Sequence, residues 1–180
     1  MLFQSIPSEH MSSERFKIYT EKLEKLLGQY NEKSNDDWDE DMKEGVKYFI
    51  LAYCYYMQKE YEKAEEFSRK SVEKIPYFDQ AFNVLCISLY RQEKFEEALL
   101  FSRKAAELEP DFNKFCGLGL FCFYTKNYDE GIDALKKAVE MNAKKKHKST
   151  AYWLLGLCYE GAGMKKESEL AFEEAHKLSQ

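Results

Sequence analysis

The sequence predicts an all-α fold made of repeated pairs of antiparallel helices. Apolar residues recur at intervals of three and four along most of the chain, which is the spacing of one face of an α-helix. The 180 residues include only 3 prolines and 8 glycines, and so few turn-forming residues argue against a β fold with many short strands. A helix-turn-helix pattern also returns about every 34 residues, which indicates an array of similar units.

The clearest of these units runs from Ala81 to Pro110. Its first apolar stripe consists of Phe82, Leu85, Cys86 and Leu89, and after a polar break a second stripe consists of Phe95, Ala98, Leu99, Ala105 and Leu108. Charged residues occupy the opposite faces. Glu109 ends the unit, because a residue that precedes proline is driven out of the helical region. The unit is therefore predicted to be a helix, a tight turn, a second helix and a stop.

The same pattern recurs on both sides of this unit. Ala64 lies 34 residues before Ala98, and Gly131 lies 33 residues after it at the equivalent place. The step from Ala138 to Ala175 is 37 residues, so about three extra residues stand between the third and fourth units. We therefore expect four repeats, over residues 45–78, 79–111, 112–145 and 149–180.

The period and the small residues at the helix crossings resemble the tetratricopeptide repeat (TPR) family. The fourth repeat matches the family pattern best, with Tyr152, Leu155, Gly156 and Tyr159 in its first helix. His176 stands where the earlier repeats place an apolar residue, as expected of a last repeat. The resemblance covers residues 45–178 and implies an α-solenoid of about four TPR helix-turn-helix repeats. It also implies that the activity is binding and not catalysis.

Residues 1–44 precede the array and are expected to differ from it. Residues 1–12 are polar and irregular, so we expect a flexible N-terminus. Residues 13–44 are expected to hold a helix and an acidic linker, and the helix has one apolar stripe of Phe16, Tyr19, Leu23, Leu26, Leu27 and Tyr30. This stripe must be buried, either on the outer face of the first repeat, as an N-terminal capping helix, or in the concave groove, as an occluder. We favour the cap, because the end of a stacked array needs covering.

Charge is distributed unevenly along the chain. The formal net charge is -5, and residues 1–44, with 6 Lys or Arg against 11 Asp or Glu, account for all of it. The acids of Asn35–Gly45 are favourable before a helix, because free amide hydrogens and the positive end of the helix dipole point at them. The neutral remainder of the chain gives no general attraction to nucleic acid or to an anionic membrane.

The cysteines indicate a reducing compartment. All five, Cys54, Cys86, Cys116, Cys122 and Cys158, fall among apolar residues of predicted first helices. An odd number of core-like cysteines without a Cys-x-x-Cys pair is typical of reduced thiols in a cytoplasmic protein. The first residues do not form a secretory signal, and no apolar stretch approaches the ~18 residues of a membrane-spanning helix. We therefore expect a cytoplasmic protein without a membrane partner.

No pattern in the sequence predicts an enzyme, a cofactor or a metal site. The three histidines stand singly, without a second ligand at helical spacing. No nucleophile stands beside a histidine that could act as its base. The glycine pairs at 117–119 and 161–163 lack the spacing of a phosphate-binding loop.

The concave groove of a TPR array is the expected binding surface. The TPR co-chaperones that hold the C-terminal carboxylate of Hsp70 or Hsp90 do so with basic and amide side chains spread over three repeats. The positions that align with that clamp hold Phe49, Tyr53, Val84, Asn113 and Gly117 in this chain. The positive charge that holds a carboxylate is missing, so those carboxylates are not expected partners.

The free side of the first helices is apolar and aromatic instead. The residues expected to line the groove are Val46, Phe49, Tyr53, Tyr56, Asn83, Ile87, Tyr90, Cys116, Leu120, Phe123, Trp153 and Leu157. Aromatic side chains are good anchors for a partner, since each buries a large area and few torsions. We predict a non-enzymatic scaffold or adaptor that binds an apolar or amphipathic peptide or helix of a partner protein. The alternative is that these side chains are internal core or are covered by the N-terminal helix.

Three further interpretations stay open. The layout resembles that of small type III secretion chaperones, in architecture only. The cluster Lys144–Lys148 is expected in a loop, where it could bind RNA, but no aromatic residue interleaves it. A nucleic-acid partner is therefore disfavoured. The sequence does not decide whether the chain forms a homodimer.

Overall fold

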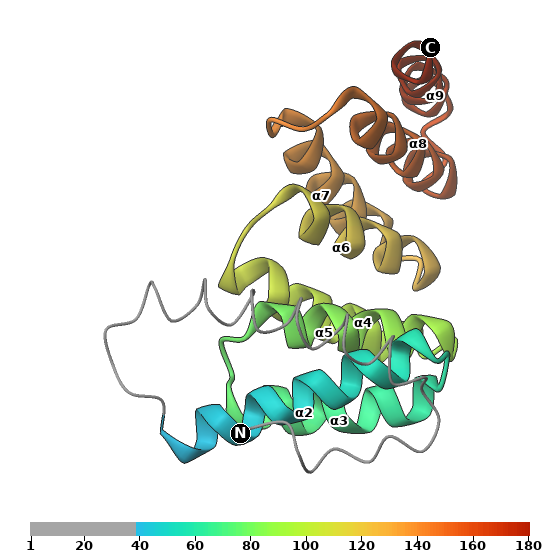
Figure 1. The fold of residues 1–180 in the computed structure, drawn as a ribbon. Coiled ribbons are helices and arrows are strands. Elements are labelled where there is room, and N and C mark those ends of the chain that lie inside the picture. Colours follow the sequence, from blue (N-terminus) through green and yellow to red (C-terminus); the bar gives the residue numbers. More distant parts are fainter. Residues whose placement is uncertain (1–38) are drawn as a thin grey trace. The chain divides into compact units, whose positions relative to one another are not determined.

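The computed structural model describes residues 39–180, and Figure 1 shows their fold. This part of the chain consists of α-helices joined by short turns and contains no strand. The helices are α2 (Glu40–Met57), α3 (Tyr61–Lys74), α4 (Asp79–Arg91), α5 (Phe95–Leu108), α6 (Phe112–Tyr124), α7 (Tyr128–Glu140), α8 (Lys145–Gly161) and α9 (Lys165–Ser179). The predicted all-α class is thus confirmed. The predicted flexible residues 1–12 and the predicted N-terminal helix lie outside the described residues.

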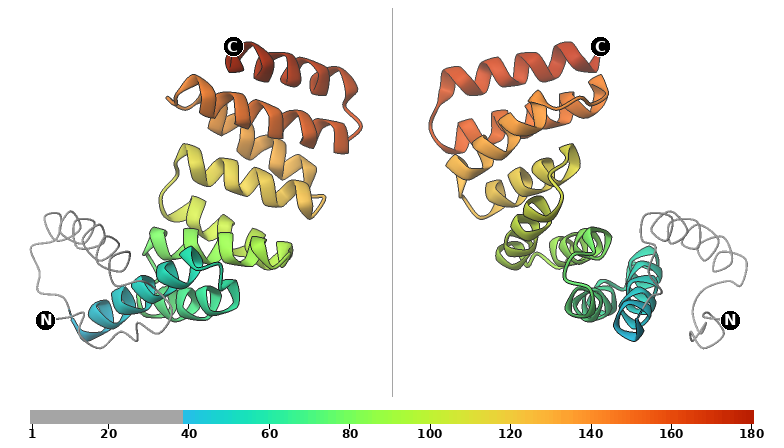
Figure 2. Two further views of the ribbon diagram at one scale, coloured as in Figure 1. Left: turned by 45° about the vertical axis from the view of Figure 1, so that its right-hand side comes forward. Right: turned by 90° about the vertical axis from the view of Figure 1, so that its left-hand side faces the viewer.

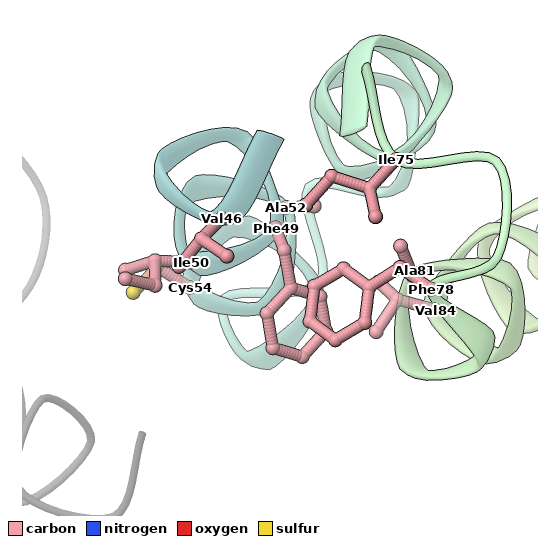
Figure 3. Packing of buried hydrophobic residues seen from close by; sticks show 9 residues of the cluster. All are labelled: Val46, Phe49, Ile50, Ala52, Cys54, Ile75, Phe78, Ala81 and Val84. Carbon is pink, nitrogen blue, oxygen red and sulfur yellow. The ribbon is translucent and has the colours of Figure 1, made fainter. Parts of the chain in front are cut away.

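The chain divides into two compact units, with the boundary between Gln92 and Glu93. In the first unit, called unit 1, α3 packs against α2 and α4, and α2 also contacts α4. The core of unit 1 consists of Val46, Phe49, Ile50, Ala52, Cys54, Ile75, Phe78, Ala81 and Val84. Figure 3 shows the rings of Phe49 and Phe78 against each other, with their centroids 4.9 Å apart. A hydrogen bond from Ser71 Oγ to the carbonyl oxygen of Gly45, 2.8 Å long, ties α3 to α2.

The second unit, unit 2, comprises residues 93–180 and packs its helices in chain order. Each of α5, α6, α7 and α8 packs against the helix that follows it, and α8 also contacts α6. Figure 2 shows α6 to α9 as successive antiparallel helices. One cluster of its core consists of Ile132, Leu135, Leu154, Leu155, Cys158, Tyr159 and Ala171. Gly131 permits a close crossing here, because a Cβ at this position would lie 2.9 Å from Cys122 Cβ and 3.1 Å from Cys158 Sγ.

The turn inside each helix pair repeats with the predicted register. One residue with a positive φ angle precedes each second helix: Lys59 (65°), Glu93 (60°), Lys126 (60°) and Gly163 (78°). The steps between them are 34, 33 and 37 residues, the same three steps that the small crossing residues show in the sequence. The long third step includes α8, which has 17 residues where α4 and α6 have 13, so the extra residues lengthen the first helix of the fourth pair.

Three sequence expectations differ from the structure. The predicted acidic linker reaches residue 44, but α2 already begins at Glu40, because the Asp39 side chain accepts a hydrogen bond of 2.8 Å from the Met42 amide and caps the helix. The lysine cluster is predicted to lie in a loop, but Lys145–Lys148 form the first turn of α8. Lysine is a good helix former, and no proline or glycine interrupts this turn. Leu108, in the second apolar stripe, is 44% exposed, since burial needs a neighbouring element as well as helical spacing.

Candidate protein-binding surface

The predicted groove residues all lie on the first helices of the pairs, α2, α4, α6 and α8. In unit 1 they are Val46, Phe49, Tyr53 and Tyr56 on α2, and Asn83, Ile87 and Tyr90 on α4. In unit 2 they are Cys116, Leu120 and Phe123 on α6, and Trp153 and Leu157 on α8. Each of these two groups of residues is described below within its own unit.

In unit 1 the aromatic side chains of α2, together with Tyr61 at the start of α3, form a continuous series. The ring centroids of Phe49 and Tyr53 are 6.3 Å apart, those of Tyr53 and Tyr56 are 6.5 Å apart, and those of Tyr56 and Tyr61 are 6.1 Å apart. Phe49 is buried, whereas Tyr53 and Tyr56 are half-buried and pack against the core. The series therefore has a buried base, Phe49, and a partly accessible outer part, Tyr53 and Tyr56.

The remaining groove residues of unit 1 differ in depth. Val46, like Phe49, is a buried core residue with 7% of its surface exposed. On α4, Asn83 is exposed, Ile87 is 38% exposed and Tyr90 is half-buried. The spacing of four and then three residues places these three on one face of α4. Val46 and Phe49 therefore belong to the core beneath this surface. Its accessible part consists of Tyr53, Tyr56, Asn83, Ile87 and Tyr90.

In unit 2 the groove residues of α6 are half-buried. Leu120 and Phe123 pack on the unit 2 core from outside, as does Leu157 of α8. The Phe123 ring lies 5.6 Å from that of Tyr124 and 6.3 Å from that of Tyr128. Cys116 is also half-buried. These side chains form a partly accessible apolar face on the core of the unit.

Trp153 has a different setting from the other groove residues. It is 51% exposed and lies at the edge of a hollow of about 540 Å³ between α8 and α9. The hollow, which we call the α8–α9 hollow, is lined by Ser149, Thr150, Trp153, Phe172, Ala175, His176 and Ser179. The sequence pattern assigned Trp153 to the groove and His176 to a polar end position, but it does not show the hollow, because the spacing within each helix does not reveal how α8 and α9 pack against each other.

The thiols of the first helices are held in the neutral form. Burial raises the pKa of Cys54 and of Cys158 to about 11, and that of Cys86 to about 12. Burial also raises the pKa of Cys116 and of Cys122 to about 12. A thiol becomes a strong nucleophile and metal ligand on ionisation, so in this conformation these cysteines act as small apolar packing residues.

Two structural searches give negative results for residues 39–180. In this part of the chain no group of three or more His, Cys, Asp or Glu residues is arranged to hold a metal ion. None of the helices there combines the length and the apolar character that crossing a membrane requires.

Comparison with protein families gives two matches, both described as tetratricopeptide repeat. One family profile matches residues 112–180 and the other matches residues 49–70. Together the two segments cover about half of the 180 residues. This chain belongs to the tetratricopeptide repeat family. The TPR resemblance seen in the sequence is thereby confirmed, and the helix pairs of α2 to α9 are its repeats.

Solved structures of similar fold are also TPR proteins. A structure described as MamA MSR-1 C2 aligns with a TM-score of 0.69 and 22% identity over 92% of this chain and 97% of that one. MamA from Desulfovibrio magneticus RS-1 aligns with a TM-score of 0.68 and 20% identity over 75% of each chain. YrrB, described as a TPR protein with an unusual peptide-binding site, gives 0.70 and 18% over 88% of this chain and 79% of that one. The likeness shows an all-α TPR solenoid. The search of curated proteins found no match.

Proposed function

We propose that this TPR protein is a protein–protein interaction scaffold that binds an apolar or amphipathic segment of a partner on the aromatic side of its first helices. The observation that supports this most is the aromatic series of α2, in which Tyr53 and Tyr56 lie half-buried on a buried base. Preformed aromatic surfaces of this kind bind with a small loss of side-chain entropy, because the rings are already held.

The arrangement favours a segment with bulky apolar side chains. A partner that covers the exposed parts of these rings gains about 25 cal/mol for each Å² of apolar surface removed from water. The tyrosine hydroxyl groups give the same surface a polar edge that can bond to a peptide backbone. Asn83 on α4 adds an exposed amide with donors and an acceptor. Such a surface suits a peptide or helix whose apolar face alternates with polar groups.

The test is a capture experiment that separates binding from folding. The tagged chain and a Tyr53→Ala, Tyr90→Ala variant are used to capture proteins from native extract, and the captured proteins are identified by mass spectrometry. Tyr77→Ala is the matched control, because Tyr77 is 52% exposed and lies in the turn between α3 and α4, outside the predicted groove residues. We expect the double variant to lose at least one partner that the Tyr77 variant retains.

Thermal unfolding of the same variants shows whether a loss of partner binding is caused by a loss of stability. We expect the double variant to lose partner binding by a factor of ten or more, which is about 1.4 kcal/mol, with a smaller loss of unfolding free energy. Equal losses in both measurements would show that the two tyrosines are core residues and would overturn the proposal. If the captured protein is soluble only when co-expressed with this chain, the scaffold acts as a chaperone.

A further inference from the structure

The α8–α9 hollow occupies a face that is covered in the preceding repeat. In unit 2, α7 packs against the first helix that follows it, α8, whereas α9 packs within this unit against α8 alone. The step of 37 residues equates Leu135 and Ala138 of α7 with Phe172 and Ala175 of α9. Leu135 and Ala138 are fully buried, but their counterparts line the hollow. No helix of unit 2 therefore covers the hollow, and an apolar side chain from another source could bind there.

The hollow has two large aromatic side chains among its lining residues, and a hydrogen bond joins its two helices. Ser149 Oγ donates a hydrogen bond of 2.7 Å to the carbonyl oxygen of Ala175 and thereby ties the start of α8 to the end of α9. Of the lining residues, Trp153 on α8 is 51% exposed and Phe172 on α9 is half-buried. A volume of about 540 Å³ is in the range of sites that hold a small organic group, so an indole ring fits.

Lysines stand at the start of α8, the helix that supplies Ser149, Thr150 and Trp153 to the hollow. Lys145, Lys146 and Lys148 lie in the first turn of α8, which contains no acidic residue, and Lys146 is one turn before Thr150 on the same face. Within residues 39–180 none of these three lysines forms an ion pair. Positive charge at a helix N-terminus is unfavourable, because it faces the positive end of the helix dipole. An anionic ligand beside the hollow would relieve this repulsion.

We propose that the hollow binds the acidic segment around Trp38 of a second copy of this chain. The segment Asn35–Asp41 reads NDDWDED, so five carboxylates flank a single tryptophan. Its described part is accessible, since the side chains of Glu40 and Asp41 at the start of α2 are 88% and 68% exposed. The indole of Trp38 would pack against Trp153 and Phe172, and the carboxylates of Asp36 and Asp37 would face the α8 lysines, because Asp39 caps α2 and Glu40 and Asp41 pair with Lys43 and Lys74. No other segment of this chain combines an aromatic ring with five flanking acids.

This pairing joins two different surfaces of the chain, one near residue 38 and one near residue 150. Each added copy brings a new acidic segment and a new hollow, so association by such a heterologous contact continues with rising concentration. Because charge pairs contribute to it, added salt should weaken the association. If the hollow bound the segment of its own chain, the mass in solution would not depend on concentration.

The experiment measures the mass of the full chain by sedimentation velocity over a range of protein and salt concentrations. We expect the weight-average mass to rise with protein concentration and to fall with added salt. The Trp38→Ala variant and the Lys145→Glu, Lys146→Glu, Lys148→Glu variant are each expected to stay monomeric. The control Lys165→Glu, Lys166→Glu changes two exposed lysines at the start of α9, and it should associate like the unaltered chain.

A mixing experiment makes the test independent of folding defects. A variant with Asp36→Lys and Asp37→Lys keeps its hollow and the Asp39 cap of α2, and the α8 lysine variant keeps its acidic segment. Each should be monomeric alone, and the two together should form complexes, because each mixture contains one intact segment and one intact hollow. A monomer at all concentrations, association that persists in the Trp38 and lysine variants, or no complex on mixing would each overturn the proposal.

Discussion

At the scale of single residues, three glycines of unit 2 have three different roles. Gly163 takes a φ of 78° and nothing lies within 4 Å of where its Cβ would be, so only its backbone conformation matters. Gly131 has no room for a Cβ because of Cys122 and Cys158. Gly117 is inside α6, and the atom nearest to its would-be Cβ is 4.0 Å away on Phe121. The three positions therefore separate backbone strain, packing and helix propensity.

Alanine substitution should give effects of opposite sign at these positions. Gly163→Ala should lower the unfolding free energy by about 1 kcal/mol, because an L-residue with positive φ is strained. Gly131→Ala should lower it by about 1–3 kcal/mol through overpacking. Gly117→Ala should raise it by about 0.5–1 kcal/mol, since alanine is the better helix former. Urea unfolding of the three variants measures these values, and a loss of stability in Gly117→Ala would contradict the assignment.

At the scale of elements, one ion pair clamps α5 to α7 in unit 2. Arg103 Nε donates to Glu130 Oε1 at 2.7 Å, and Arg103 Nη2 donates to Glu130 Oε2 at 2.6 Å. The hydrogen bonds from the Arg103 guanidinium hold the pKa of Glu130 below its ordinary value of 4.5. Both side chains are about two-fifths exposed, so solvent screening limits the stabilisation to about 0.5–1 kcal/mol.

Acid should release this clamp. A lowered pKa in the folded state means that the stabilisation is present above the ordinary pKa of 4.5, which applies to the unfolded chain, and is lost as the pH falls through the folded-state value. We expect the difference in melting temperature between the unaltered chain and Glu130→Gln to be largest near pH 7 and to shrink towards pH 3. Asp133→Asn, an exposed position on the same helix, is the control. A difference that stays constant with pH would show that the pair does not contribute.

At the scale of the whole molecule, the described chain consists of two compact units, and each carries part of the proposed partner surface. The repeats of a TPR array contact only their neighbours, so its stability depends on what covers the ends of each stack. At one end, residues 1–34 supply the predicted capping helix, which lies outside the described residues. At the other end, the α8–α9 hollow is formed by the last helix pair.

Deletion of residues 1–34 distinguishes a cap from an occluder. We expect the truncated chain to melt at a lower temperature and to retain the partners captured by the full chain, because a cap stabilises the array without filling the groove. The deletion leaves the acidic segment and α2 intact. Tighter partner binding with an unchanged melting temperature would identify the segment as an occluder of the groove instead.

The sequence by itself determined the repeat. The steps of 34, 33 and 37 residues, the small residues at Ala64, Ala98 and Gly131, and the stop at Pro110 were all readable, because helical spacing and turn chemistry are local properties. The family followed from the same pattern. The partner did not, since a TPR scaffold is shared by proteins with many different ligands.

Only the tertiary structure decided which apolar side chains are accessible. Val46 and Tyr53 occupy similar positions in the α2 pattern, yet one is buried and the other is half-buried. The hollow beside Trp153 likewise needs Phe172 and His176 from the next helix. Accessibility is set by neighbours that are distant in the sequence, so the periodicity of one helix predicts which residues share a face but not what covers that face.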